Sequence, residues 1–217
     1  MHPGVFCGAN AKKQATRILI LGESHYWSEE KKDEDKFTFK VVEAYLNKYN
    51  SKIRTEKDRS YRFFDNIVQS FGIEPENRTE FWNRVWFGNY IDEPCGIRDS
   101  KATKLLKKPG KREAINKQLF EFINENEIDV VFCFSRKVYN KLPSLDEDLG
   151  DKETKGDEND SHRLNKCAYC AGAAQRKYVS VSLSRSVTVY GLKHPSQGFS
   201  YRKYQARLAD IMKEIGI

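Results

Sequence analysis

Two residues near opposite ends of the chain, Glu23 and His194, have the types and settings that acid–base chemistry requires. Glu23 follows the apolar run 18–21 and Gly22, and His194 follows an apolar run that ends at Leu192. Each pattern is typical of a buried strand that runs into a polar loop. In an open α/β sheet, ligands bind where the carboxyl ends of the strands meet, so residues remote in sequence can share one pocket. We therefore predict that a carboxylate and an imidazole face one ligand.

Both residues also have ordinary structural explanations, which the sequence leaves open. Glu23 could be a solvated glutamate or contact a helix N-terminus, whereas the wall of a buried strand would suit a base that orients water. A lone histidine is more often structural than catalytic, but Pro195 restricts the backbone after His194 and would hold its imidazole in a rigid turn. Ser196 could cap the following helix or bind a phosphate.

The cysteine pattern is only a weak indication of metal binding. Cys167 and Cys170 form half of a zinc pattern with His162 as a third ligand, but a structural zinc site needs four ligands and the chain has no second Cys-x-x-Cys pair. We therefore predict no bound metal. The five cysteines stand at irregular positions, which indicates free thiols rather than a disulfide framework. Because the chain has no phosphate-cradling glycine loop, we predict no nucleotide cofactor either.

The net charge of +7 favours an anionic partner, and nucleic acid is the commonest one for a basic, aromatic-rich domain. Many cations alternate with acids, as in residues 29–36, and a solvated surface explains such a segment equally well. No apolar run approaches the roughly 20 residues of a membrane span, and the N-terminus has no signal-peptide core. We predict a cytoplasmic (intracellular) protein with no membrane association.

The elements that must position these residues alternate between strands and helices. Apolar runs predict strands at residues 17–21, 85–87, 129–134, 178–182 and 187–190. Apolar residues at helical spacing predict helices at residues 39–49, 61–71, 111–126, 138–142 and 201–215. This alternation implies an α/β fold with a mostly parallel sheet covered on both sides. Gly22 is expected to end the first strand, and Asn89 to lie on the loop after the second.

The whole chain, residues 1–217, is predicted to form one domain with a polar insertion. Its length suits a single domain of ordinary to large size. The segment at 143–166 is polar and acidic with almost nothing to bury, so we expect a mobile surface insertion or a lid there.

Three motifs, in this order, resemble those of the uracil-DNA glycosylase superfamily. Residues 22–26, Gly-Glu-Ser-His-Tyr, resemble its Gly-led water-activating motif, Asn89 resembles the asparagine after a middle strand, and residues 194–196, His-Pro-Ser, resemble the last motif. The resemblance extends from residue 17 to about residue 205. It implies a three-layer α/β/α sandwich with a short, mostly parallel central sheet. It also implies a hydrolase that cleaves the N-glycosidic bond of a deaminated base, uracil or a related one, in DNA.

The resemblance further implies a role for each candidate residue. Glu23 would orient or activate water, and His194 would stabilise negative charge on the leaving base. Asn89 would read the Watson–Crick edge of a base that has left the helical stack, and Tyr26 matches a position that excludes a 5-methyl group in one branch. The base-binding candidates besides Asn89 are Ser24, His25, Tyr26, Phe37 and Phe39, and the candidates for phosphate contacts are Lys193, Ser196 and Arg202.

Several departures from the superfamily's pattern keep other functions open. Ser24 stands where one branch has aspartate, and His25 replaces the proline of the motif, so the backbone that positions water can differ. Only Cys7 lies near the N-terminus, so we predict no iron–sulfur cluster. The alternatives are a non-catalytic module that binds a nucleobase or nucleic acid on the same fold, and an unrelated hydrolase with a small glycosidic substrate.

Overall fold

The structure is a computed structural model of the 217-residue chain. It describes residues 5–25, 37–50, 61–94, 104–143, 174–178, 186–195 and 199–215. The predicted insertion at 143–166 lies outside these parts of the chain, apart from Pro143. Within them, no helix has both the length and the apolar character that crossing a membrane requires.

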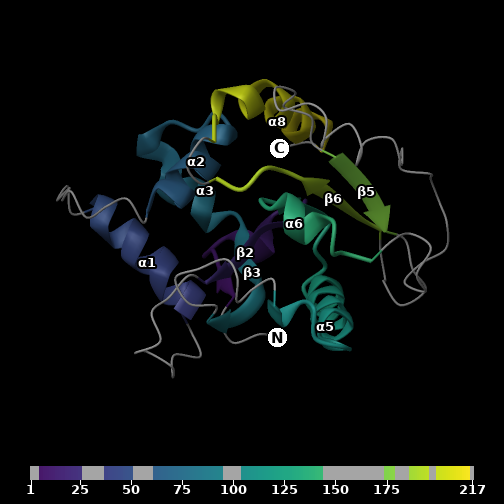
Figure 1. Cartoon of the computed structure of the whole chain (residues 1–217). Helices are drawn as coiled ribbons and strands as arrows, with labels where there is room; N and C mark the ends of the chain where they lie inside the picture. Colours follow the sequence, from purple (N-terminus) through teal and green to yellow (C-terminus); the bar gives the residue numbers. More distant parts are fainter. Residues whose placement is uncertain are drawn as a thin grey trace.

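A six-stranded, mostly parallel sheet forms the middle of the described structure (Figure 1). Its strands are β1 (Phe6–Cys7), β2 (Ile18–His25), β3 (Trp86–Pro94), β4 (Val130–Cys133), β5 (Ala174–Tyr178) and β6 (Val187–Gly191). They lie in the order β1-β3-β2-β4-β6-β5. The four inner strands β3, β2, β4 and β6 are parallel, whereas β1 and β5 pair antiparallel at the two margins. The carboxyl ends of β2, β3, β4 and β6 therefore meet at one edge, which we call the carboxyl edge; the other is the amino edge.

Helices cover both faces of this sheet, as the sequence predicts for an α/β fold. They are α1 (Phe37–Asn50), α2 (Arg62–Ser70), α3 (Arg78–Asn83), α5 (Lys111–Glu125), α6 (Arg136–Tyr139) and α8 (Arg202–Glu214), with the short 3-10 helices η1 (Ala11–Lys13) and η3 (Pro75–Asn77). Helices α1, α2, α3 and α8 contribute to one apolar core, and α5 and α6 contribute to the other. Figure 1 shows α8 and α5 on opposite sides of the sheet.

Strand β2 shows why the inner strands are apolar on both faces. Its side chains alternate, so that Ile18 and Ile20 enter one core while Leu19 and Leu21 enter the other. All four are almost completely buried. A strand buried on both faces has a continuous apolar sequence rather than an alternating one. The same is true of β4, in which every residue is buried.

Two strands continue further than predicted, and this corrects the expected setting of the candidate residues. Gly22 does not end β2, because the pairing with β3 continues from Gly22 opposite Asn89 to Ser24 opposite Ile91. The pairing of β2 with β4, by contrast, ends at Leu21. Glu23 and Asn89 therefore lie within strands and not on loops. The prediction of loops was wrong because the length of a strand depends on its neighbour, which the local sequence does not specify.

Other elements differ from prediction at their ends. The helix expected at 138–142 is the single turn α6, which begins at Arg136 after a capping serine. The strand expected at 178–182 is β5, which ends at Tyr178; residues 179–185 lie outside the described parts of the chain. Strand β1 and helix α3 were not predicted, because two and six residues are too few for a periodic pattern.

Candidate functional site

Glu23 lies buried near the carboxyl end of β2 and is held by two side chains that follow β4. Its exposed fraction is 6%. The Ser135 hydroxyl donates a 2.8 Å hydrogen bond to Glu23 Oε2. The Lys137 ammonium lies 3.9 Å from Glu23 Oε1, and its side chain is 59% exposed. Burial of a charged group without partners is costly, so this pairing keeps a carboxylate in place where β2 and β4 separate.

Ser135 fixes the direction of this hydrogen bond. Its hydroxyl oxygen also accepts a 3.3 Å hydrogen bond from the Val138 amide, which caps α6. A hydroxyl has a single proton, and the proton is directed to the Glu23 carboxylate because the amide can only donate. Sequence reasoning missed Ser135, although a signal was present: it directly follows the buried strand at 129–134, as Glu23 follows its own apolar run.

Gly22 makes room for the Asn89 side chain on the adjacent strand. The two residues are paired in the register of β2 and β3. A Cβ atom on Gly22 would lie 2.4 Å from Asn89 Oδ1, which is far inside van der Waals contact. The glycine is therefore explained by this close approach rather than by a turn. Asn89 is half-buried at the same edge.

Phe63 of α2 lies next to Gly22 of β2 and next to His194, the third residue after β6. Its ring centroid is 5.3 Å from that of His194 and 6.0 Å from that of Phe87. Its Cζ atom would lie 3.5 Å from a Cβ on Gly22. The sequence placed Phe63 in the buried stripe of its helix, but it is only half-buried. This ring brings the neighbourhood of Asn89 and His194 together, although the two lie far apart in the sequence.

The turn that carries His194 is tied to two helices. The Asn66 side chain of α2 donates a 3.2 Å hydrogen bond to the Pro195 carbonyl. Tyr204 of α8 contacts the Lys193 backbone and the Arg136 side chain. Burial raises the pKa of the Tyr204 hydroxyl. The positive charge of Arg136 and the hydrogen bonds of Tyr204 with the Lys193 backbone and the Arg136 side chain partly offset this rise. The turn that carries the His194 imidazole is therefore held in place by contacts with α2 and α8, in agreement with the rigid turn expected from Pro195.

Ser24 is a buried hydroxyl with no hydrogen-bond partner among the described residues. Its exposed fraction is 9%. Side chains alternate along a strand, so Ser24 shares the face of Gly22, where Asn89 lies. An unsatisfied buried hydroxyl costs about 1–3 kcal/mol, so it is suited to a polar atom of a ligand.

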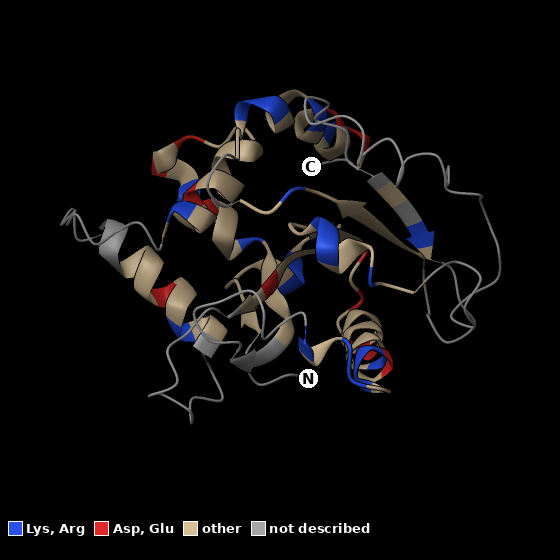
Figure 2. Cartoon of the chain, viewed as in Figure 1, with Lys and Arg blue, Asp and Glu red and all other residues tan. Residues whose placement is uncertain are grey.

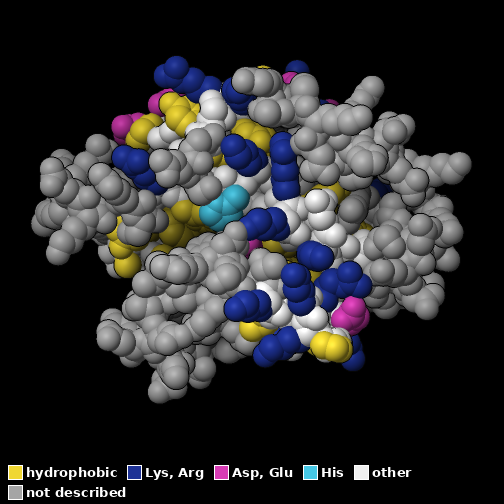
Figure 3. Space-filling model, viewed as in Figure 1, with side chains coloured by type: hydrophobic (Ala, Val, Ile, Leu, Met, Phe, Trp, Pro, Cys, Tyr) yellow, Lys and Arg dark blue, Asp and Glu magenta, His cyan; other side chains and the backbone are white. Residues whose placement is uncertain are grey.

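The surroundings of these residues are basic. Lys137, Lys193 and Arg202 are exposed, and the Arg202 guanidinium lies 5.9 Å from the centre of the Tyr201 ring. Figure 2 shows the positive charge at the beginning of α6. In Figure 3, the histidine drawn in cyan lies near the middle of the visible face, with apolar side chains on one side and Lys and Arg on the other. The site therefore suits a ligand that carries negative charge beside an apolar ring.

The structure describes the side chains of few other predicted site residues. Residues Tyr26, Ser196, His162, Cys167 and Cys170 lie outside the described parts of the chain, and for His25 and Phe37 only the backbone is described. Phe39 of α1 packs its ring 5.9 Å from that of Phe6, beside the first core. Within the part of the chain that the structure describes, no three His, Cys, Asp or Glu side chains are grouped to hold a metal ion.

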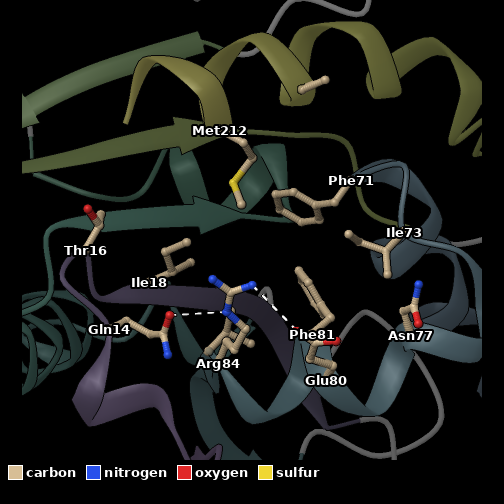
Figure 4. Close-up of a pocket in the computed structure, with 12 residues that line it drawn as sticks. Gln14, Thr16, Ile18, Phe71, Ile73, Asn77, Glu80, Phe81, Arg84 and Met212 are labelled. Carbon is tan, nitrogen blue, oxygen red and sulfur yellow. Dashed lines mark hydrogen bonds and ion pairs between the residues drawn. The ribbon is translucent and has the colours of Figure 1, made fainter. Parts of the chain in front are cut away.

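A cavity of 410 Å³ lies at the amino edge, away from these residues. Thr16 and Ile18, at the beginning of β2, line it together with side chains of α3 and α8. Figure 4 shows Phe71, Phe81 and Met212 around an apolar interior, with Arg84 at its rim. The Arg84 Nε donates a 3.2 Å hydrogen bond to the Gln14 side chain. This cavity has space but few groups that could move a proton.

Neither a scan against protein-family models nor a search of curated proteins finds a match for this chain. Its chemistry is therefore inferred from the carboxyl edge itself. Glu23 can orient a water molecule or stabilise a positive charge, and His194 can stabilise a negative one. The amide of Asn89 can donate to and accept from the edge of a heterocycle.

Proposed function

We propose that the protein is a DNA glycosylase that hydrolyses the N-glycosidic bond of a deaminated base, uracil or a related one, on a uracil-DNA glycosylase-like α/β/α fold. The observation that carries the proposal is the position of Glu23, Asn89 and His194. Glu23 lies on β2, Asn89 lies on β3 and His194 lies on the turn that follows β6, so the three are remote in sequence but belong to one edge of the sheet. Their order along the chain is the order of the motifs on which the resemblance rests.

The proposed reaction breaks the bond between the sugar C1′ and the base nitrogen. The bonding electrons leave with the base, so positive charge develops on the sugar and negative charge on the base oxygens. His194 stabilises the leaving base through a hydrogen bond. Glu23 orients a water molecule whose oxygen bonds to C1′, and the proton that this water loses neutralises the base. The carboxylate also stabilises the cationic sugar before water attacks.

Recognition in this proposal takes place on a base that has left the duplex stack. Asn89 hydrogen-bonds to the Watson–Crick edge, because an amide can match a carbonyl and an adjacent N–H together. The unsatisfied Ser24 hydroxyl lies on the same strand face and supplies a further polar contact. The half-buried ring of Phe63 offers an apolar surface next to His194.

The test uses end-labelled single- and double-stranded oligonucleotides that carry one uracil, hypoxanthine or xanthine. Excision leaves an abasic site, which alkali converts into a strand break. The expected result is cleavage at one of these bases by the wild-type protein and its loss in Glu23→Gln. Glu121→Gln is the matched control, since Glu121 is exposed on α5 and pairs only with exposed Lys117 at 3.9 Å. Absence of cleavage from folded wild-type protein on every substrate would contradict the proposal.

One observation favours a second candidate, a non-catalytic module that binds a nucleobase or nucleic acid. Both carboxylate oxygens of Glu23 have partners, Ser135 and Lys137, so the group could be a structural link between β2 and α6. In that case Glu23→Gln would leave oligonucleotide binding unchanged, and no variant or wild-type protein would excise a base. The excision assay distinguishes the two functions, and a gel shift on the same oligonucleotides shows that a protein without excision activity still binds.

A further inference from the structure

Residues 104–112, which we call the basic segment, contain five cations and no carboxylate; they end the connection from β3 and include the first two residues of α5. The cations are Lys104, Lys107, Lys108, Lys111 and Arg112. We propose that the basic segment binds the phosphate backbone of the nucleic acid strand that leads into the Glu23–His194 site. The inference rests on the proposed function, and it assigns the strand a contact surface that the motifs do not include.

The local structure directs the lysines of this segment outward. Leu105 and Leu106 pack against the second apolar core. The backbone turns around them, with 3.2 Å hydrogen bonds from the Lys107 amide to the Lys104 carbonyl and from the Lys108 amide to the Leu105 carbonyl. All three lysines are exposed. Their positive charges are therefore carried on an anchored backbone, which lowers the entropy cost of binding.

Topology places the basic segment at the carboxyl edge of the sheet. It follows β3 along the chain and continues into the first turn of α5, and α5 packs against the sheet before the chain enters β4. In parallel β-α-β units, the segment between a strand and its following helix lies at the carboxyl ends of the strands. Glu23 and the turn of His194 lie at this same edge. Figure 3 shows Lys and Arg gathered on the face that also displays the histidine.

The charge pattern of the basic segment differs from that of the helix it leads into. Beyond it, α5 alternates its charges, as in the Lys117–Glu121 pair at 3.9 Å. Arg112 makes a 3.0 Å ion pair with Glu113, so the excess charge is concentrated on Lys104, Lys107 and Lys108. A cluster of one sign attracts a polyanion, and nucleic acid gains further from the release of its counterions. A membrane surface fits less well, because Leu105 and Leu106 pack against the core and therefore do not serve as an apolar anchor beside the lysines.

The test compares two pairs of adjacent lysines. Lys107→Ala/Lys108→Ala removes charge from the basic segment, and Lys12→Ala/Lys13→Ala removes the same charge from η1. The η1 pair lies at the amino edge, since β1 runs antiparallel to β3 and the Asn10 amide bonds to the Asn83 carbonyl, before β3 begins. The probe is a fluorescent, undamaged oligonucleotide, titrated at several salt concentrations. Loss of two phosphate contacts lowers the slope of log affinity against log salt by about 1.4 for a single strand and about 1.8 for a duplex.

The expected result is a weaker and less salt-dependent affinity for Lys107→Ala/Lys108→Ala alone. Equal slopes for the two lysine pairs would overturn the inference. So would tighter binding of the wild-type protein to phosphatidylserine vesicles than to the oligonucleotide, if this binding is lost in Lys107→Ala/Lys108→Ala. Base excision is measured on the same proteins. If the wild-type protein excises a base but Lys107→Ala/Lys108→Ala leaves the salt slope unchanged, the basic segment is not the strand-binding surface and the glycosylase proposal stands. If the double variant lowers the salt slope but no protein excises a base, the glycosylase proposal is refuted and the binding surface is supported.

Discussion

The two edges of the central sheet differ in what they offer a ligand. The amino edge has a cavity of 410 Å³ with mainly apolar walls. The carboxyl edge has Glu23, Ser24 and Asn89 from two adjacent strands, with His194 from a third position along the edge. This cavity and the polar side chains that could act on a ligand therefore lie at opposite ends of the same strands.

The polar groups at the two edges also differ in burial. Arg84 and Glu80 at the amino-edge cavity are 46% and 73% exposed, so their ion pair at 4.0 Å costs little and contributes little. Glu23 and Ser24 are 6% and 9% exposed. Burial of polar groups is unfavourable for folding, and folds tolerate this cost most often at functional sites. The carboxyl edge is therefore the better candidate despite the cavity at the other end.

The largest expected effect on stability comes from the amino edge. Phe71→Ala should lower the free energy of unfolding by about 3–5 kcal/mol, because Phe71 is a buried aromatic ring in a packed core. Its centroid lies 5.1 Å from that of Phe81 and 5.0 Å from that of Phe132. Urea unfolding measures the change, and Phe71→Leu is the milder control. Excision per folded molecule should stay unchanged; a large fall for Phe71→Leu would show that the amino edge takes part in function.

The largest expected effect on activity comes from His194→Ala. Loss of a donor to a developing negative charge should lower the excision rate about 100- to 1000-fold. Stability should change little, since His194 is only half-buried. The single-turnover rate at saturating protein measures the effect free of product release. A rate within twofold of wild type would remove His194 from the mechanism.

Gly22→Ala should separate recognition from folding. The new Cβ would lie 2.4 Å from Asn89 Oδ1, so the amide must rotate away. Because the obstacle is the end of a side chain, the stability loss should be at the low end of the about 1–3 kcal/mol typical of overpacking. Base recognition should fall more, which is measured as a higher KM on the cognate oligonucleotide.

The double variant Gly22→Ala/Asn89→Ala provides the control for this clash. Removal of the Asn89 amide should restore the stability that Gly22→Ala loses, because the two residues are in contact and their effects are not additive. Recognition should not be restored. If the double variant is as unstable as the sum of the single variants, the explanation of Gly22 as space for Asn89 is wrong.

Ser135→Ala should have a smaller effect on stability. It removes the cap of α6 and a hydrogen bond to a buried carboxylate, for a loss of about 1–2 kcal/mol. Thermal unfolding measures it. Ser70→Ala is the matched control, since Ser70 is equally buried but its hydroxyl donates only to a carbonyl of its own helix. A lower excision rate in Ser135→Ala, with no change in Ser70→Ala, would show that Ser135 positions Glu23.

The smallest expected effect comes from Arg84→Ala at the rim of the amino-edge cavity. Its side chain is exposed and its ion pair is long, so the free energy of unfolding should change by less than about 0.5 kcal/mol. Excision should not change. A loss of activity similar to that of His194→Ala would reverse the comparison of the two edges.

The sequence predicted the long amphipathic helices well and the ends of the strands poorly. Helices α2, α5 and α8 have apolar stripes that their local sequences specify, and the structure confirms them within two residues at each end. Strand β2 was expected to end at Gly22, but its pairing with β3 carries it to His25. Pairing partners are set by the tertiary structure, so no local pattern could show this extension.

The candidate site was predictable only in part, for a similar reason. Glu23, Asn89 and His194 were identified from residue type and the position of each after an apolar run. Ser135 and Phe63 were missed, because their roles depend on which elements lie side by side. Phe63 satisfies the helical period of α2 and packs against the first core, but its ring also contacts His194. Sequence alone therefore indicated the reactive groups but not the residues that hold them.

The most direct test of the account is amide hydrogen exchange with and without a bound oligonucleotide. The oligonucleotide carries the base identified by excision on a 2′-fluorinated sugar, which resists cleavage and keeps the complex intact. Ligand binding should slow exchange at residues 22–25 and 192–194 and leave residues 71–73 and 209–212 unchanged. Slower exchange around Phe71 and Met212, with no change at the carboxyl edge, would contradict the assignment of the functional site.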